Sequence, residues 1–239
     1  MILLISDVQC HYGVINAQLA HATEELGHEV SQILVLGDLG AYETNLHTFF
    51  RRDGHRFDRP VSFIEGNHED FTAFDALVAS YADVLTYLPR SSVQQLDRWR
   101  MLCLGGTRYM DALSTPMGSE IVERDIVACL AHAPGEVDLV ISHDCPMNIG
   151  VRGAPGFEHY GVPGIPGSGR IAAHHRPRFW FFGHHHHWHD CEVDGTRYLG
   201  LPMSWHGYCL LDSTGEVHCV ERKIDMPADP WWLRFLGMK

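Results

Sequence analysis

The chain has 239 residues, of which 45% are hydrophobic and 20% are charged, and its formal net charge is −12. This length and composition fit one globular domain whose hydrophobic core is large enough to fold without disulfide bonds or structural metals. The acidic balance excludes a broad electrostatic grip on a polyanion, so no extended nucleic-acid surface is expected. No apolar run approaches the roughly 20 residues that span a membrane, and the start lacks a basic lead-in, so we expect a cytoplasmic protein without a membrane partner.

The predicted elements alternate between strands and helices in the first half of the chain. Apolar runs predict strands at 1–7, 31–36, 60–65, 99–105, 137–142, 179–182, 197–201, 207–212 and 216–221. Apolar residues at helical spacing predict helices at 14–26, 71–82 and 120–132, and a helix start capped by Ser168 predicts one at 169–175. The segment 72–88 is expected to lead into a hairpin, and the last strands are expected to form hairpins on a second sheet. The alternation predicts α/β layers with parallel pairing in the first half.

A single domain is expected over residues 1–239, because no linker divides the chain. Residues 145–170 are rich in glycine and proline, and an irregular stretch of this length is commonly functional. The apolar tail at 225–239 is expected to dock on its own domain, and self-association into a homo-oligomer through it is the alternative.

Five of the predicted strands end in polar residues that bind metals well. The segments are Asp7-Val8-Gln9, Gly37-Asp38, Gly66-Asn67-His68-Glu69, Ser142-His143-Asp144 and Gly183-His184-His185-His186. Each segment alone has an ordinary explanation, since an aspartate after a strand is commonly a turn residue and a lone histidine is commonly structural. Their joint occurrence, each after an apolar run, favours a site at the carboxyl ends of the strands. The 18 histidines support a metal site, because imidazole is the commonest metal ligand in proteins.

The ordered set resembles the calcineurin-like metallophosphoesterase family, whose pattern is Asp-x-His, Gly-Asp, Gly-Asn-His-Asp/Glu, His and Gly-His-x-His. The likeness spans about residues 1–200. It implies a four-layer α/β/β/α sandwich of two mixed sheets flanked by helices, with the metal site at the C-terminal ends of the strands. It also implies a hydrolase that cleaves phosphate esters with water or hydroxide activated between two divalent metal ions. Mn²⁺ is the first expectation, and Fe, Zn, Ni and Mg are the alternatives.

The resemblance also implies a role for each site residue. The implied ligands are Asp7, Gln9 and His186 for the first ion, Asp38 as the bridge, and Asn67, His143 and His184 for the second ion. His68 is not a ligand in the family and faces the leaving group, where an imidazole can act as a general acid. Relatives that lack this histidine are scaffolds, so its presence favours an active enzyme.

Two departures from the family pattern bear on activity. Gln9 stands where the family has histidine, and its neutral amide predicts weaker binding of the first ion and a preference for Mn²⁺ or Mg²⁺ over Zn²⁺. His11 is an alternative ligand if the loop adjusts. After Asp38 the chain lacks the Asp-Arg-Gly of the phosphoprotein phosphatase branch, which argues against that branch.

The substrate is expected to be a small phosphate ester or a short nucleotide. Ser142-His143-Asp144-Cys145-Pro146 is similar to the Ser-His-Asp-x-Pro of lariat debranching enzymes, although those enzymes replace the first aspartate by cysteine and Asp7 is intact. This likeness favours a phosphodiester. A phosphomonoesterase acting on nucleotides or small metabolites is the near alternative, and a metal-stabilised scaffold without turnover is the alternative of another class.

Four further residues are candidates for substrate contacts. Arg152 and Arg170 lie in or at the end of the glycine-rich stretch and could clamp a phosphate through two hydrogen bonds each. His11 and His206 follow the first and last motifs and are candidates for the substrate side of the site. For each of them, an ordinary surface role is the competing interpretation.

Overall fold

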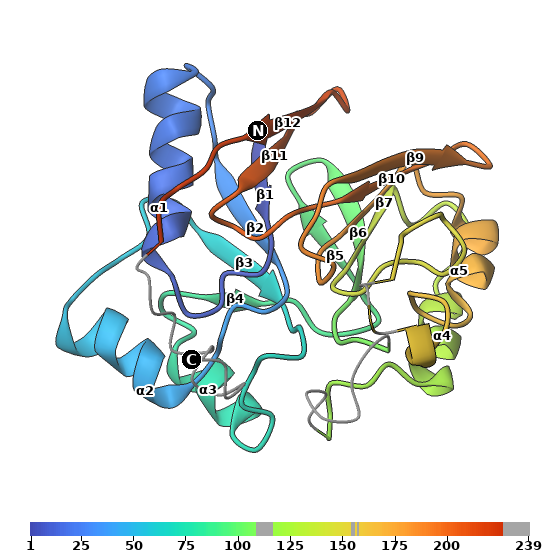
Figure 1. The fold of residues 1–239 in the computed structure, drawn as a ribbon, viewed down its shortest axis with the longest axis horizontal. Coiled ribbons are helices and arrows are strands. Elements are labelled where there is room, and N and C mark those ends of the chain that lie inside the picture. Colours follow the sequence, from blue (N-terminus) through green and yellow to red (C-terminus); the bar gives the residue numbers. More distant parts are fainter. Residues whose placement is uncertain (109–116, 154–155, 157, 227–239) are drawn as a thin grey trace.

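The computed structural model describes residues 1–108, 117–153, 156 and 158–226, and its strands form two six-stranded sheets that face each other (Figure 1). The first sheet has the order β12-β11-β1-β2-β3-β4, and the second has the order β5-β6-β7-β8-β10-β9. The strands of the first sheet are β1 (Ile2–Ile5), β2 (Gln32–Leu36), β3 (Val61–Ile64), β4 (Thr86–Tyr87), β11 (Gly207–Leu211) and β12 (Val217–Glu221). Those of the second are β5 (Ser92–Leu96), β6 (Trp99–Leu104), β7 (Leu139–Ser142), β8 (Phe179–Phe182), β9 (His189–Val193) and β10 (Thr196–Gly200).

Helices cover the outer face of each sheet. On the first sheet lie α1 (Gly13–Ala20), α2 (Glu43–Leu46) and α3 (Phe74–Ser80), and on the second lie α4 (Glu123–Leu130) and α5 (Ser168–His175). The helices α1 and α2 continue directly into π-helical segments, His21–Glu25 and His47–Arg52, and a 3₁₀ turn spans Glu158–Tyr160. Within the described residues, no helix is long and apolar enough to cross a membrane.

Three separate apolar cores hold these four layers together. Along β1 the side chains alternate: Leu3 and Ile5 pack towards the helices, whereas Leu4 packs between the two sheets. A third core lies between the second sheet and α4 and α5, with Trp180 and Ile126 at its centre. Because the central strands are buried on both faces, their sequences are continuous apolar runs rather than alternating ones. The predicted four-layer sandwich of two mixed sheets is therefore confirmed.

Most predicted elements are present, with shorter bounds. The pairings β1–β2, β2–β3 and β3–β4 are all parallel, as predicted for the first half. The strand predicted at 179–182 has the bounds of β8. The prediction for the last strands was wrong in part, because β11 pairs with β1 and so places the β11–β12 hairpin in the first sheet. Its apolar side chains complete both cores that flank that sheet.

Local features elsewhere in the chain agree with the predictions only in part. The segment 72–88 leads into the antiparallel hairpin of β5 and β6, as predicted, and its own strand β4 pairs in parallel with β3. The strand β9 and the helix α2 were not predicted, because their apolar residues follow neither the alternation of a strand nor the spacing of a helix clearly. Ser168 does not cap α5: Gly167 holds the cap position, and the Ser168 hydroxyl accepts a hydrogen bond from the Met147 amide at 2.9 Å. The predicted docking of the tail concerns residues that lie mostly outside the described ones.

Candidate metal centre

The predicted ligand segments leave the C-terminal ends of five strands drawn from both sheets. Asp7 follows β1, Asp38 follows β2 and Asn67 follows β3, all in the first sheet. His143 follows β7 and His184 follows β8 in the second sheet. Ligand atoms of Asp7, Asp38 and His143 all lie within 4.8 Å of one another, and all three residues are buried. The centre therefore forms where the carboxyl ends of the two sheets meet.

Glycines next to the ligands make this close approach possible. A Cβ atom on Gly66 would overlap the carboxylate of Asp38, and one on Gly183 would overlap the Ser6 side chain. Neither glycine has a positive φ, so the requirement here is for space and not for an unusual backbone conformation. In the Gly-Asn and Gly-His pairs, the glycine is therefore the residue that contacts the end of the neighbouring strand.

Four acidic or histidine residues of the centre turn the backbone sharply. The φ angles are 54° at Asp7, 51° at Asp38, 66° at His184 and 58° at His186. Residues other than glycine rarely adopt this left-handed region, and such conformations cost of order 1–3 kcal/mol each. Their concentration at the strand ends aims the side chains of these residues into one place.

Three N–H groups orient the Asp38 carboxylate. Its Oδ1 accepts hydrogen bonds from the backbone amides of Asn67 at 2.7 Å and His68 at 2.8 Å. Its Oδ2 accepts one from the Gln9 side-chain amide at 2.8 Å. Burial opposes its charge, but the imidazoles of His143 and His68 outweigh burial and hold the pKa of Asp38 well below its usual range. Asp38 is therefore an oriented anion.

His143 is oriented by the backbone of the first sheet. Its Nδ1 lies 2.8 Å from the Leu36 carbonyl oxygen, which fixes Nδ1 as the donor and turns Nε2 towards the centre. That Nε2 lies 3.2 Å from Asp38 Oδ1 and 3.1 Å from Asn67 Oδ1. Burial opposes the charge on the ring, but the carboxylates of Asp38 and Asp7 outweigh it and raise the pKa of His143 to about 10. Without a bound ion, Nε2 therefore carries a proton and faces Asp38, and an ion bound there would take the place of that proton.

The Asp7 carboxylate contacts the segment that follows β8 in the second sheet. Its Oδ2 accepts a hydrogen bond from the His184 amide at 3.1 Å, and its Oδ1 lies 3.1 Å from His186 Nε2. Burial acts against ionisation, but His186 outweighs it and the pKa of Asp7 is lowered. The carboxylate thus connects the end of β1 to the Gly-His segment after β8.

His184 contacts Thr107, which in turn contacts Asp144, and the sequence analysis assigned no role to either residue. The Nε2 of His184 lies 3.3 Å from the Thr107 hydroxyl, which in turn lies 3.3 Å from Asp144 Oδ2. The other oxygen of Asp144 lies 3.1 Å from His185 Nε2. Burial lowers the pKa of His184 to about 4, so its ring is neutral, which is the form that binds a metal. The Ser-His-Asp motif contained Asp144, but nothing in the sequence pointed to Thr107.

Glu69 joins the two loops that carry Asp38 and Asn67. Its carboxylate accepts hydrogen bonds from the amides of Leu39 at 3.0 Å, Ala41 at 2.5 Å and Gly66 at 3.4 Å. Burial and the nearby charge of Asp38 raise the pKa of Glu69 to about 8, against the effect of the three amide donors. Glu69, the last residue of the Gly-Asn-His-Glu segment, therefore fixes the positions of the loops that carry Asp38 and Asn67.

The donor set suits a divalent cation. Asp7 and Asp38 are both at most 1% exposed, and no lysine or arginine in the described ranges is ion-paired with either of them. Two buried carboxylates in one place are costly unless a positive charge compensates them. Carboxylate oxygens with imidazole nitrogens are a donor set for Mn, Fe, Zn and similar ions. The residues present thus fit a metal centre.

His68 and Gln9 flank the centre in different ways. The His68 side chain is 40% exposed and its Nε2 lies 3.9 Å from Asp38 Oδ2, so the ring stands at the open side. Gln9 is only 4% exposed and turns its amide nitrogen towards Asp38. An amide nitrogen is not a ligand, so the role of Gln9 as a ligand stays a prediction that requires the amide oxygen to turn to the ion.

The structure does not bring the four candidate substrate residues into contact with the carboxylates. Arg170 is ion-paired with Glu123 on the outer helical layer, and Arg152 is exposed after β7. His206 is exposed beside Trp205. His11 packs edge-on against the same tryptophan, and its buried Nε2 has no hydrogen-bond partner in the described part of the chain. Their substrate roles stay predictions.

Comparisons with known proteins agree with this geometry. A family model described as calcineurin-like phosphoesterase matches residues 1–188. No curated protein matches the sequence significantly. Solved structures with a similar fold include GAP50, the anchor in the inner membrane complex of Plasmodium, with a TM-score of 0.53 at 9% identity, covering 100% of this chain and 94% of that one. Another is a putative 5′-nucleotidase from Staphylococcus aureus, with a TM-score of 0.52 at 12% identity, covering 98% of this chain and 57% of that one.

A third is the hypothetical protein PH1004 from Pyrococcus horikoshii OT3, with a TM-score of 0.50 at 9% identity, covering 100% of this chain and 95% of that one. At these identities the solved structures show a shared fold and nothing further.

Proposed function

The chain belongs to the calcineurin-like phosphoesterase family and is a hydrolase of phosphate esters, and we propose that its substrate is a phosphodiester. The supporting observation is the buried cluster of Asp7, Asp38 and His143 with the exposed ring of His68 at its open side. The cluster carries no arginine or lysine paired to its carboxylates within the described residues. A diester brings one negative charge, whereas a monoester brings close to two at neutral pH, so a site without such a clamp suits the diester better.

We propose the ligand roles that the family pattern implies. The proposed ligands are Asp7, Gln9 and His186 on one side, Asp38 as the bridge, and Asn67, His143 and His184 on the other side. Divalent ions held by these groups, with Mn²⁺ proposed first, would supply a water of lowered pKa and would neutralise charge on the phosphoryl oxygens. The number of ions, the cytoplasmic location and the homo-oligomer stay predictions.

The protein's own residues would then position and protonate the substrate. Asp38 stays ionised and fixed because two backbone amides and Gln9 donate to it. His143 cannot rotate freely, because the Leu36 carbonyl accepts its Nδ1 proton. In the proposed role, the partly exposed ring of His68 faces the departing oxygen, and a protonated imidazole there would donate the proton that the leaving group needs.

The test is hydrolysis of bis-p-nitrophenyl phosphate against p-nitrophenyl phosphate, after chelation and with Mn²⁺ returned. We expect the diester to be cleaved faster and the activity to depend on Mn²⁺. Faster cleavage of the monoester would replace the proposal by the phosphomonoesterase alternative. No cleavage of either with any divalent ion would leave the scaffold alternative.

A further inference from the structure

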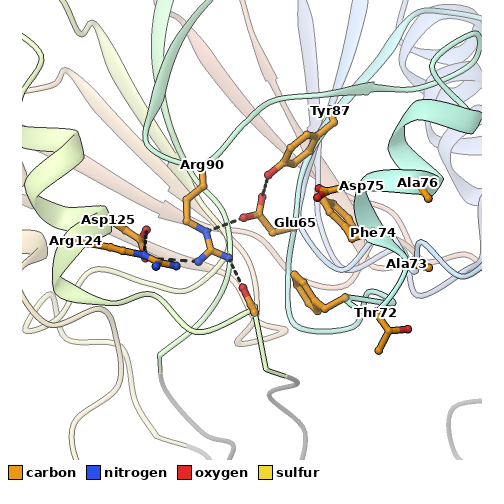
Figure 2. A pocket seen from close by; sticks show the side chains of 12 residues that line it. Glu65, Thr72, Ala73, Phe74, Asp75, Ala76, Tyr87, Arg90, Arg124 and Asp125 are labelled. Carbon is orange, nitrogen blue, oxygen red and sulfur yellow. Dashed lines mark hydrogen bonds and ion pairs between the residues drawn. The ribbon is translucent and has the colours of Figure 1, made fainter.

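A cavity of about 660 Å³ lies between the start of α3 and the start of α4 (Figure 2). Its volume lies within the roughly 300–1,000 Å³ that is usual for small-molecule sites. The residues that the argument uses from its lining are Glu65, Phe71, Phe74, Asp75, Tyr87, Arg90, Arg124 and Asp125. None of these residues belongs to the proposed ligand set.

Two walls of the cavity continue directly from the metal centre. One wall begins at Phe71, three residues after His68 in the same loop. Gly118 also lines the cavity and packs against Phe71, since an added Cβ would lie 3.3 Å from the ring. The next residue, Ser119, accepts a hydrogen bond from the amide of Thr107 at 3.0 Å, and the Thr107 hydroxyl contacts His184. The cavity is therefore lined by segments that also run to, or contact, the loops of the metal centre.

The wall formed by α3 and the loop before it is aromatic. Phe71 and Phe74 are stacked with ring centroids 5.6 Å apart, and Phe74 meets Tyr87 edge-on at 5.1 Å. Phe74 is buried, whereas Phe71 is partly exposed to the cavity. A half-exposed ring backed by a second ring is a platform on which a flat heterocycle can stack.

The buried charges of the cavity are already paired. Glu65 receives hydrogen bonds from Arg90 at 2.7 Å and from the Tyr87 hydroxyl at 3.0 Å, as Figure 2 shows. The same guanidinium also donates to the carbonyl oxygens of Gly118, Ser119 and Glu120. The N–H groups of Arg90 are thus used in contacts within the protein, so this side chain is not expected to bind a phosphate.

The remaining charges disfavour a second anion. Three carboxylates, those of Glu65, Asp75 and Asp125, face two guanidinium groups in the lining, which leaves one net negative charge. Arg124 is the most exposed cation, and it lies 3.8 Å from Asp125. A neutral group that carries hydrogen-bond donors fits this lining, whereas a further phosphate would meet repulsion.

We propose that this cavity binds the nucleobase of the leaving group, so that the substrate is a nucleoside phosphodiester. The base stacks on Phe71, and its amino or imino groups donate to carboxylates such as that of Asp75. The proposal rests on the phosphodiesterase function proposed above and narrows it to a substrate class. It predicts that the nucleoside part alone is recognised, without its phosphate.

The test measures adenosine binding by isothermal titration calorimetry to the protein saturated with Mn²⁺, with ribose as the probe that lacks a base. We expect adenosine to bind and ribose not to bind. Phe71→Leu keeps an apolar side chain but removes the ring, so it should weaken adenosine binding about tenfold, since base–aromatic stacking contributes roughly this much. Phe57→Leu, which changes an aromatic residue of another part of the core, should leave the affinity unchanged.

A second variant covers the case that Phe71→Leu does not fold. Ala76 lines the cavity from an exposed position of α3, so Ala76→Gln should narrow the cavity without disturbing the core and should also weaken adenosine binding. Equal binding of adenosine and ribose, or adenosine binding that neither variant changes, would overturn the proposal.

The two proposals fail in different ways. Hydrolysis of bis-p-nitrophenyl phosphate without any adenosine binding would retain the phosphodiesterase and reject the base site. Adenosine binding that depends on Phe71, in a protein that cleaves no diester, would retain the base site and reject the phosphodiesterase.

Discussion

At the residue scale, Gln9 is the departure with the clearest consequence. Its amide nitrogen donates to Asp38 Oδ2, so the side chain stabilises the proposed bridging carboxylate instead of adding an imidazole ligand. An ion bound at Asp7 and His186 would therefore lack one nitrogen donor that the family pattern supplies. The chain should therefore hold one ion more tightly than the other.

Changing Gln9→His should strengthen the weaker site and raise the number of tightly bound Zn²⁺ ions from about one to two, because imidazole prefers Zn²⁺. The measurement is metal content after dialysis, together with calorimetric titration. Gln95→His places the same side chain at an exposed position and should leave the content unchanged. Two equally tight Zn²⁺ sites in the unaltered protein would contradict this account.

His68→Ala should slow hydrolysis according to the leaving group. Loss of a general acid costs about 10²- to 10⁴-fold where the leaving oxygen needs a proton. The nucleoside alkoxide of a dinucleotide needs one, whereas p-nitrophenolate leaves readily without it. The measurement is kcat on both substrates, with His47→Ala as the control at an exposed position. An equal loss on both substrates would indicate that His68 does not act as the acid.

Gly66→Ala tests the close packing of the strand ends. The added methyl group would overlap the Asp38 carboxylate, so metal binding should be lost and the free energy of unfolding should fall by about 1–3 kcal/mol. Gly169→Ala is the matched control: nothing lies within 4 Å of its Cβ position, and in α5 alanine should stabilise by about 0.5–1 kcal/mol. Urea unfolding and metal titration measure both, and equal effects of the two changes would count against the steric argument.

At the element scale, Arg90 connects pieces that are distant in the sequence. Its side chain pairs with Glu65 after β3 and donates to carbonyl oxygens at 118–120 before α4. Arg90 therefore links the end of β3 in the first sheet to the segment that precedes α4, the helix that packs on the second sheet. Glu65, Arg90 and Gly118, which this connection joins, also line the cavity.

Replacing Arg90→Met should destabilise the protein strongly, because the Glu65 carboxylate, only 3% exposed, would lose its cation. Breaking a buried pair from one side costs about 3–5 kcal/mol. Arg170→Met breaks the exposed pair with Glu123 and should cost no more than about 1 kcal/mol. The free energy of unfolding in urea measures the difference, and similar costs for the two variants would show that the Arg90 pair is not structurally important.

At the scale of the whole molecule, the metal centre lies where both sheets end, so bound ions should stabilise the entire fold. Free metal at 100 times its dissociation constant adds about 2.7 kcal/mol by mass action. Chelation should therefore lower the melting temperature, and Mn²⁺ should restore it. Asp38→Asn should abolish this response. An unchanged melting temperature on chelation would mean that the two sheets are held together without the ions.

The sequence by itself determined the alternation of buried strands with helices and the polar residues that follow the strands. Strands buried on both faces must be continuous apolar runs, and a polar residue that ends such a run must stand at the edge of a sheet. That is why Asp7, Asp38, His143 and β8 could be identified from local pattern. The glycines beside them carried the same information, because only glycine admits the neighbouring strand end so closely.

Only the tertiary structure decided how these parts meet. The β11–β12 hairpin joins the first sheet through pairing with β1, a contact across most of the chain that no local period encodes. The contact of Thr107 with His184, and the orientation of Gln9 towards Asp38, likewise depend on which loops the two sheets bring together. Local pattern reports the burial and periodicity of a residue, whereas its partners follow from packing between distant segments, and that packing shapes the cavity proposed here to select the substrate.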